Sequence, residues 1–217
     1  MSYWVKEVFY SLQGEGARTG RAAVFCRFTG CNLWSGREQD RHRAVCRFCD
    51  TDFRGTDGAG GGRYGTADQL ADRVLAAWST EVAASVNAGG RPYCVCTGGE
   101  PLLQLDSALI AALHARGFEV AVETNGTRPV PHGIDWICVS PKAGAALRLC
   151  AGDELKLVYP QPAAPPEAYA GLAFAHFYLQ PMAGPEVAAN TQKAIAYCKA
   201  HPGWRLSLQT HKLLGIP

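Results

Sequence analysis

Short apolar segments alternate with helix-like segments along most of the chain, and this alternation constrains the fold more than any other feature. Strands that alternate with helices form parallel βαβ units, because a parallel strand pair needs a crossover connection. Strands are predicted at 22–28, 93–97, 118–123, 136–139, 154–158, 174–179 and 205–208, and helices at about 67–84, 107–116 and 186–200. The pattern predicts an α/β fold with a single domain, 1–217, whose sheet curls into a partial TIM-like barrel of about six βα units.

The composition is ordinary for a globular protein, with 47% hydrophobic residues, 18% charged residues and a net charge of +2. So small a net charge argues against a dedicated nucleic-acid scaffold. The longest apolar runs fall far short of the roughly 20 residues that cross a bilayer, and residues 1–6 do not resemble a signal peptide. We therefore expect a cytoplasmic protein that binds neither nucleic acid nor membrane. Residues 55–62 contain five glycines, which predicts a mobile loop.

Polar residues gather where the predicted strands end. They lie at 97–100, 123–125, 140–142 and Gln180. In parallel α/β sheets and barrels, binding sites form at the carboxyl ends of the strands. We therefore expect all four groups to face one cavity.

Nine cysteines are many for a chain expected in the cytoplasm, where clustered cysteines more often bind metal than form disulfides. Four of them lie inside apolar runs and are predicted to be buried hydrophobic residues: Cys26, Cys94, Cys96 and Cys138.

Cys46 and Cys49 form a C-x-x-C motif, and fourteen residues, 32–45, separate it from Cys31. Four kinds of site compete for this set. A structural zinc site normally needs a fourth ligand, such as His42 or Cys26. A redox pair would not use Cys31, and an electron-transfer cluster lacks its fourth thiolate. The fourth possibility is a [4Fe–4S] cluster held by three thiolates, with one iron open to a cofactor or substrate.

Two further motifs bear on this choice. An aromatic residue, Phe48, precedes the last cysteine, and the turn Gly98-Gly99-Glu100-Pro101 follows the second predicted strand. Together with the cysteines they resemble the radical S-adenosylmethionine (SAM) superfamily. The usual spacing there is C-x3-C-x2-C, so the long segment 32–45 is a departure, and we interpret it as a cluster-binding insertion.

Motifs along nearly the whole chain resemble the 7-carboxy-7-deazaguanine synthase family more closely. They are Ser11 to Gly16, Arg27, Cys49-Asp50-Thr51, Glu123 to Thr127, Ser140-Pro141-Lys142 and Gln209-Thr210-His211-Lys212. The long cysteine spacing also occurs in some members of this family.

The resemblance implies a lyase of queuosine and deazapurine biosynthesis. It would convert 6-carboxy-5,6,7,8-tetrahydropterin to 7-carboxy-7-deazaguanine with loss of ammonia, using a [4Fe–4S] cluster, SAM and Mg²⁺. It further implies a homodimer and an electron donor such as flavodoxin. Two other functions compete with this one: a radical SAM activase that acts on a partner protein, and a zinc-binding module that is not an enzyme.

The resemblance also assigns site residues. The metal ligands are Cys31, Cys46 and Cys49 for the cluster and Thr51 for Mg²⁺. The SAM-binding residues are Phe48, Cys49, Asp50, Gly98, Gly99, Glu100, Ser140, Pro141, Lys142 and Gln180. The substrate-binding residues are Leu12, Gln13, Gly14, Glu15, Arg27, Thr97 and Pro217, the last through its terminal carboxylate. His211 and Lys212 are expected to cover the pocket.

For several of these residues a purely structural role is the alternative. Gln13 and Glu15 also fit a simple glycine-rich turn, and Lys142 and Gln180 fit ordinary surface or strand-end positions. Arg27 lies in an apolar strand and needs an anionic partner, which is either the substrate carboxylate or a carboxylate of the protein.

Overall fold

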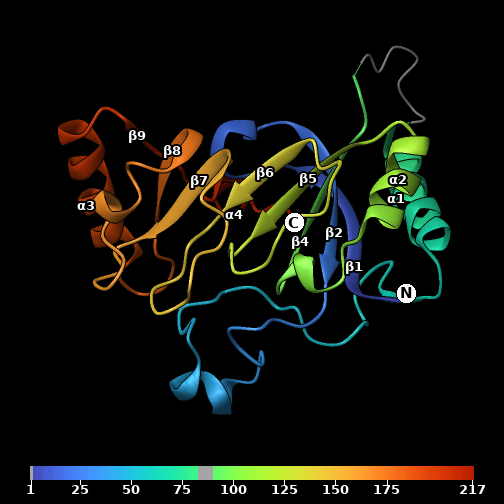
Figure 1. Cartoon of the computed structure of the whole chain (residues 1–217), viewed down its shortest axis with the longest axis horizontal. Helices are drawn as coiled ribbons and strands as arrows, with labels where there is room; N and C mark the ends of the chain where they lie inside the picture. The colour runs from blue at the N-terminus through green and yellow to red at the C-terminus, as the bar shows by residue number, and fades with distance from the viewer. Residues whose placement is uncertain (1, 83–89) are drawn as a thin grey trace.

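The apolar segments pair into one nine-stranded sheet with the order β3-β1-β2-β4-β5-β6-β7-β8-β9 (Figure 1). The computed structural model describes residues 2–82 and 90–217. The strands are β1 (Tyr3–Leu12), β2 (Ala22–Phe28), β3 (Gly62–Tyr64), β4 (Tyr93–Gly98), β5 (Glu119–Thr124), β6 (Trp136–Val139), β7 (Ala151–Tyr159), β8 (Ala173–Pro181) and β9 (Trp204–Leu206). The helices are α1 (Ala67–Val82), α2 (Ser107–Ala115), α3 (Val187–Ala200) and α4 (Thr210–Leu214), with 3-10 turns η1 (Gly16–Arg18), η2 (Glu38–Arg43), η3 (Pro101–Leu103) and η4 (Pro166–Ala168).

Most of the sheet is parallel, as the alternating pattern predicts. From β2 through β4 to β9 each strand runs parallel to its neighbour, whereas β1 is antiparallel to β2 and to β3. The carboxyl ends of seven strands therefore lie along one edge. Within the described residues no pairing joins β3 to β9, so the sheet is open.

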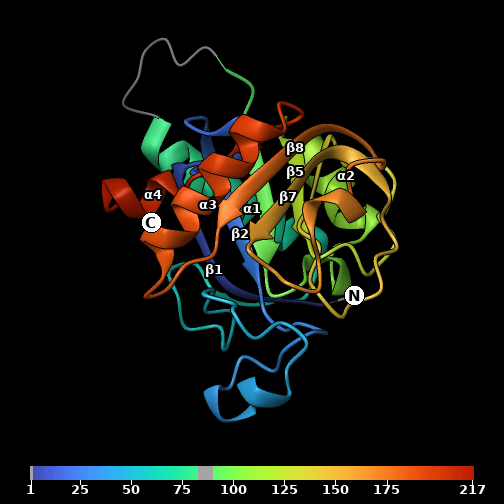
Figure 2. The same ribbon diagram turned by 90° about the vertical axis from the view of Figure 1, so that its left-hand side faces the viewer.

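The helices bury two separate parts of the core. α1 and α2 pack together near β1, while α3 packs against β8 and β9 at the other end (Figures 1 and 2). One cluster of buried side chains lies under α1 and α2, and the other lies under α3. The four cysteines predicted to be buried are at most 3% exposed, which confirms that prediction. No helix in the described part of the chain is long and apolar enough to cross a membrane.

Seven predicted strands and three predicted helices are present, with shifts at their ends. The prediction missed β1, whose register with β2 shifts between Val5 and Glu7. Such a bulge interrupts the alternation of buried and exposed residues that marks a strand. It also missed the short elements β3 and α4. The first predicted helix was extended to 84, but α1 is described only to Val82, and residues 83 and 84 lie outside the described residues.

The glycine-rich segment 55–62 is held against β1 instead of standing free. The backbone N–H of Gly58 donates to Lys6 O at 3.0 Å, and that of Val8 donates to Ala59 O at 2.8 Å. A Cβ atom at Gly61 would lie 2.2 Å from Lys6 O. The glycines therefore allow two backbones to pack closely. The prediction of a mobile loop was wrong, because the segment is hydrogen-bonded to β1.

Candidate active site

One open cavity of about 440 Å³ lies at the carboxyl edge of the parallel strands. All four polar groups predicted to follow strands contribute to its wall, which confirms that they face one cavity. Predicted site residues that line it are Leu12, Gln13, Gly14, Glu15, Arg27, Cys46, Phe48, Cys49, Asp50, Thr51, Thr97, Gly98, Gly99, Ser140, Lys142, Gln180, His211, Lys212 and Pro217. Cys31, Glu100 and Pro141 do not line it.

Two of the three predicted cluster cysteines face the cavity together. A hydrogen bond from the Cys46 thiol lowers the pKa of Cys49 to about 6, and the same contact raises the pKa of Cys46. Cys31 lies behind them beside the glycine turn, since a Cβ atom at Gly99 would approach the Cys31 Cβ atom to 3.1 Å. Burial raises the pKa of Cys31, although backbone N–H groups, including that of Leu33 at 3.4 Å, point at its sulfur.

The chemistry of the donor set fits an iron–sulfur cluster, because Cys31, Cys46 and Cys49 supply three free thiols. Thiolates that bind different irons of a [4Fe–4S] cluster are spread apart, and three cysteine sulfurs are suitable ligands for it. These cysteines would hold the cluster, with one iron left for a further ligand.

The turn after β4 is packed too tightly for any side chain. Gly98 has φ +121°, and a Cβ atom there would lie 2.2 Å from Phe28 O. A Cβ atom at Gly99 would lie 2.1 Å from Gly30 O. The turn therefore presents bare backbone to the cavity.

Glu100 is fully buried behind this turn. Its carboxylate accepts hydrogen bonds from Thr124 Oγ1 at 2.7 Å, Asn125 N at 2.8 Å and Leu102 N at 3.0 Å. Burial raises the pKa of Glu100, and these donors oppose that shift. In this structure its carboxylate ties the turn to the end of β5. A contact between Glu100 and the SAM amino group stays a prediction.

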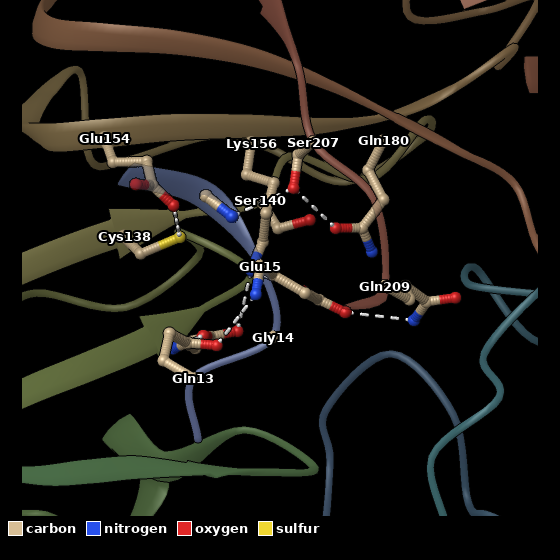
Figure 3. Close-up of polar contacts among 12 residues, drawn as sticks. Gln13, Gly14, Glu15, Cys138, Ser140, Glu154, Lys156, Gln180, Ser207 and Gln209 are labelled. Carbon is tan, nitrogen blue, oxygen red and sulfur yellow. Dashed lines mark hydrogen bonds and ion pairs between the residues drawn. The ribbon is translucent and has the colours of Figure 1, made fainter. Parts of the chain in front are cut away.

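Gln13 and Glu15 belong to a polar network on one wall (Figure 3). Lys156 Nζ lies 2.6 Å from Glu15 Oε2 and 3.0 Å from Glu123 Oε2. Gln13 Nε2 donates to Glu123 Oε1 at 2.9 Å, and Gln209 Nε2 donates to Glu15 Oε1 at 3.0 Å. Lys156 was not predicted as a site residue. The pattern that could have identified it is the alternation in β7, where Glu154 and Lys156 point to the face of the sheet opposite Leu155 and Leu157.

Arg27 points into the cavity from β2 and already has a protein partner. Its Nε lies 2.7 Å from Glu7 Oε1, and its guanidinium lies 5.6 Å from the ring centre of Phe9. A protein carboxylate was one of the two anionic partners considered for this residue. Because both side chains line the cavity, a ligand carboxylate could still reach Arg27 there.

The proposed magnesium ligand, Thr51, lies between two acidic residues that lysines neutralise. Asp50 pairs with Lys212, and Asp52 pairs with Lys6 at 3.0 Å. One neutral hydroxyl is a weak site for Mg²⁺, which prefers several oxygen ligands. A bound substrate with its own carboxylate would supply the missing oxygens.

Several predicted SAM-binding residues lie on two neighbouring segments, the loop after β6 and the cysteine loop (residues 46–51). Lys142 Nζ donates to Ser140 O at 2.8 Å and lies 6.0 Å from the ring centre of Phe48. Burial lowers the pKa of Lys142. Gln180, at the end of β8, accepts a hydrogen bond from Ser207 at 3.3 Å. Pro141 is buried, and its carbonyl accepts from Gln161.

The segment that contains α4 closes one side of the cavity, as expected for His211 and Lys212. Thr210 N and Oγ1 each donate to Gly14 O at 2.9 Å, and Ser11 Oγ donates to Pro217 O at 2.7 Å. These contacts hold the segment against the end of β1.

No family model matches the chain. It is 65% identical to the 7-carboxy-7-deazaguanine synthase of Bradyrhizobium diazoefficiens, and the alignment covers all of both chains. The chain belongs to the 7-carboxy-7-deazaguanine synthase family. The synthase of Caulobacter vibrioides is 63% identical, again over all of both chains. The crystal structure of QueE from Escherichia coli has a TM-score of 0.64 and 26% identity, and covers 96% of this chain and 94% of its own. The motifs predicted this family and predicted an enzyme, and the comparisons confirm both predictions.

Proposed function

We propose that the enzyme is a radical SAM lyase that contracts the ring of 6-carboxy-5,6,7,8-tetrahydropterin to 7-carboxy-7-deazaguanine, with loss of ammonia. The observation that carries this proposal is the shared cavity, where the cysteine loop and the bare glycine turn face Gln13, Glu15 and Arg27. When bound, the cluster and SAM would supply hydrogen-atom abstraction.

The protein's own residues would bind and orient the substrate. Arg27 would bind the substrate carboxylate, because a guanidinium matches a carboxylate in shape and charge. Gln13 and Glu15 would bind the amino and carbonyl edge of the pterin. His211 and the terminal residue Pro217 would limit access of water from the side of α4. Thr51 would bind Mg²⁺ together with the substrate carboxylate.

Four further features belong to the same proposal. The open sheet with a cavity at its carboxyl edge supports a partial barrel of the TIM type. The whole chain would form one radical SAM domain, with 32–45 as an insertion. The homodimer is supported by family resemblance alone, whereas the cytoplasmic location is the expectation from the short apolar runs and residues 1–6.

Anaerobic turnover tests the function directly. The reconstituted protein is incubated with SAM, a chemical reductant, Mg²⁺ and carboxytetrahydropterin, and the product is identified by mass. We expect 7-carboxy-7-deazaguanine, from a brown protein with about four irons. A colourless protein with one bound zinc, or no product from a fully loaded enzyme, would refute the proposal. Transfer of a radical to a partner protein would favour the activase alternative.

The segment around η2, which we call the basic arm (residues 35–47), projects from the body in both views (Figures 1 and 2). Arg41 Nη1 donates to the carbonyl of Arg47 within the arm at 2.9 Å. It also donates to the carbonyl of Cys49 at 3.1 Å, and this bond holds the arm to the part of the cysteine loop that follows it. Arg37, Arg43 and Arg47 are exposed, and none of them forms an ion pair with another described residue. We assign this surface to an acidic electron donor such as flavodoxin.

Charge reversal on the basic arm is expected to slow reduction by the protein donor. Because complementary charge accelerates encounter, R43E/R47E should reduce the rate with flavodoxin at least about 10-fold at low salt. Stopped-flow absorbance of the cluster measures the rate. Reduction by dithionite should not change, and K193E/K199E on α3 provides a control with the same change in charge. Equal rates with flavodoxin in both variants would exclude the arm as the docking surface.

A further inference from the structure

A buried lysine holds together the wall that contains Gln13 and Glu15. The Lys156 side chain is only 4% exposed and comes from the middle of β7. Its ammonium lies 2.6 Å from one oxygen of Glu15 and 3.0 Å from one oxygen of Glu123. Figure 3 shows Lys156 beside Glu15. A buried ammonium needs such partners, because neither its charge nor its three donors can be left unpaired.

The remaining oxygens of both carboxylates are held by amides. Gln209 donates to Glu15 Oε1, and Gln13 donates to Glu123 Oε1. The backbone N–H of Glu15 donates to Gln13 Oε1 at 3.1 Å, which closes the network and fixes which way the Gln13 amide faces. Each carboxylate oxygen has accepted one hydrogen bond and keeps capacity for another.

The charges on this wall do not cancel. One ammonium faces two carboxylates, which leaves an excess negative charge toward the cavity. Behind them, the Glu154 carboxylate accepts hydrogen bonds from Cys138 Sγ at 3.2 Å and from Ala17 N at 2.7 Å. Burial raises the pKa of Glu154.

Glu15 stays ionised in this setting. Burial alone would raise the pKa of Glu15, but the Lys156 ammonium outweighs it and lowers the pKa to about 2, with help from Gln209 and His211. Other groups that face Lys156 are Glu123, Glu154, Cys138 and Lys142. Without Lys156, two adjacent half-buried carboxylates would repel each other, and one of them would take up a proton.

We propose that Lys156 is a positioning residue that fixes Glu15 and Glu123 as charged hydrogen-bond acceptors, so that this wall selects ligand edges that carry N–H donors. This inference rests on the proposed function, because the 2-amino edge of a pterin is such an edge. A lumazine carries a carbonyl oxygen in place of the amino group. That oxygen would face the carboxylates of Glu15 and Glu123, and two acceptors cannot form a hydrogen bond with each other. Selection of the amino form is therefore a consequence of the charge on Lys156.

The test compares binding of 6-carboxypterin and 6-carboxylumazine to the reconstituted enzyme with SAM and Mg²⁺, by quenching of ligand fluorescence. The wild type should prefer 6-carboxypterin at least about 100-fold, because unpaired buried acceptors penalise the other ligand. With Glu15 ionised throughout, this ratio should stay constant from about pH 5 to about pH 7.

In K156M the ratio should fall below about 10-fold near pH 5 and rise with pH. A carboxyl that has gained a proton donates to the lumazine carbonyl, and it loses that proton as the pH increases. K156R should restore a constant ratio. Equal weakening of both ligands at every pH in K156M would reveal a purely structural role and overturn the inference. So would failure of the wild type to prefer 6-carboxypterin.

K156M leaves two half-buried carboxylates without a cation and is at risk of misfolding. If circular dichroism shows that it does not fold, K156M/E123Q removes one charge of each sign. Burial still raises the pKa of Glu15 once the ammonium is absent, so the ratio in this variant should also rise with pH. A constant ratio in that variant overturns the inference as well. Turnover separates the two levels: product formation without ligand preference refutes only the role of Lys156, whereas ligand preference without turnover refutes only the proposed reaction.

Discussion

C46A should reduce turnover by at least about 1,000-fold and lower the bound iron well below four per chain, because thiolates are the protein ligands of such clusters. Cys46 is 5% exposed, hydrogen-bonds to Cys49 and interacts with the charge of Lys142. Iron analysis, the absorbance of the cluster and anaerobic turnover measure the two effects.

C96A provides the matched control. Cys96 is a fully buried cysteine of β4 that packs in the core, away from the cavity. Its replacement should cost about 1 kcal/mol of stability and leave iron content and turnover unchanged. If C46A retained four irons and its activity, the cluster assignment of the cysteine loop would be wrong.

R27M is expected to raise KM for carboxytetrahydropterin by about 100-fold to about 1,000-fold, with a smaller effect on kcat. Removing one partner of a desolvated charge pair typically costs 2–5 kcal/mol, and about 1.4 kcal/mol corresponds to a factor of ten. The Arg27 side chain is 22% exposed at the cavity, so solvent screens it only in part. Steady-state kinetics gives both constants.

E7Q tests the same site in the opposite direction. Glu7 competes with the substrate carboxylate for Arg27, so a neutral side chain should lower KM by a few-fold. R21M is the control, because Arg21 pairs with Glu119 and does not line the cavity. An unchanged KM in R27M would assign Arg27 to the structural pair with Glu7 alone.

The parallel part of the sheet could be predicted from sequence because its strands are continuous apolar runs. β2 and β6 begin and end at the predicted residues, and their side chains are mostly buried or half-buried. The cavity followed from the same pattern, since parallel strands bring their carboxyl ends to one edge. The elements that were missed are those in which tertiary contacts outweigh the local pattern. In β1 a bulge interrupts the alternation, and 55–62 is held by tertiary contacts, among them those with Lys6 and Val8.

The partners of individual site residues could not be predicted, because they join segments far apart in the chain. Glu100 is bonded to the end of β5, and Arg27 is paired with Glu7 across the β1–β2 hairpin. Lys156 is a polar residue within a strand, and only the fold shows that it meets Glu15. Residue types pointed to the chemistry of the site, but their pairing depends on the packed structure.

The bond between Glu15 and Gln209 joins positions 194 residues apart, and Thr210 is bonded in the same way to Gly14. At a synthesis rate of about 5–20 residues per second, the ribosome needs roughly 10–40 s to make the second half of this wall after the first. A nascent chain therefore contains most of the sheet before the wall of the cavity is complete. Products of interrupted translation that lack residues 208–217 would retain the parallel strands but would be poor at capturing the ligand, so substrate capture has to wait until these residues have been made.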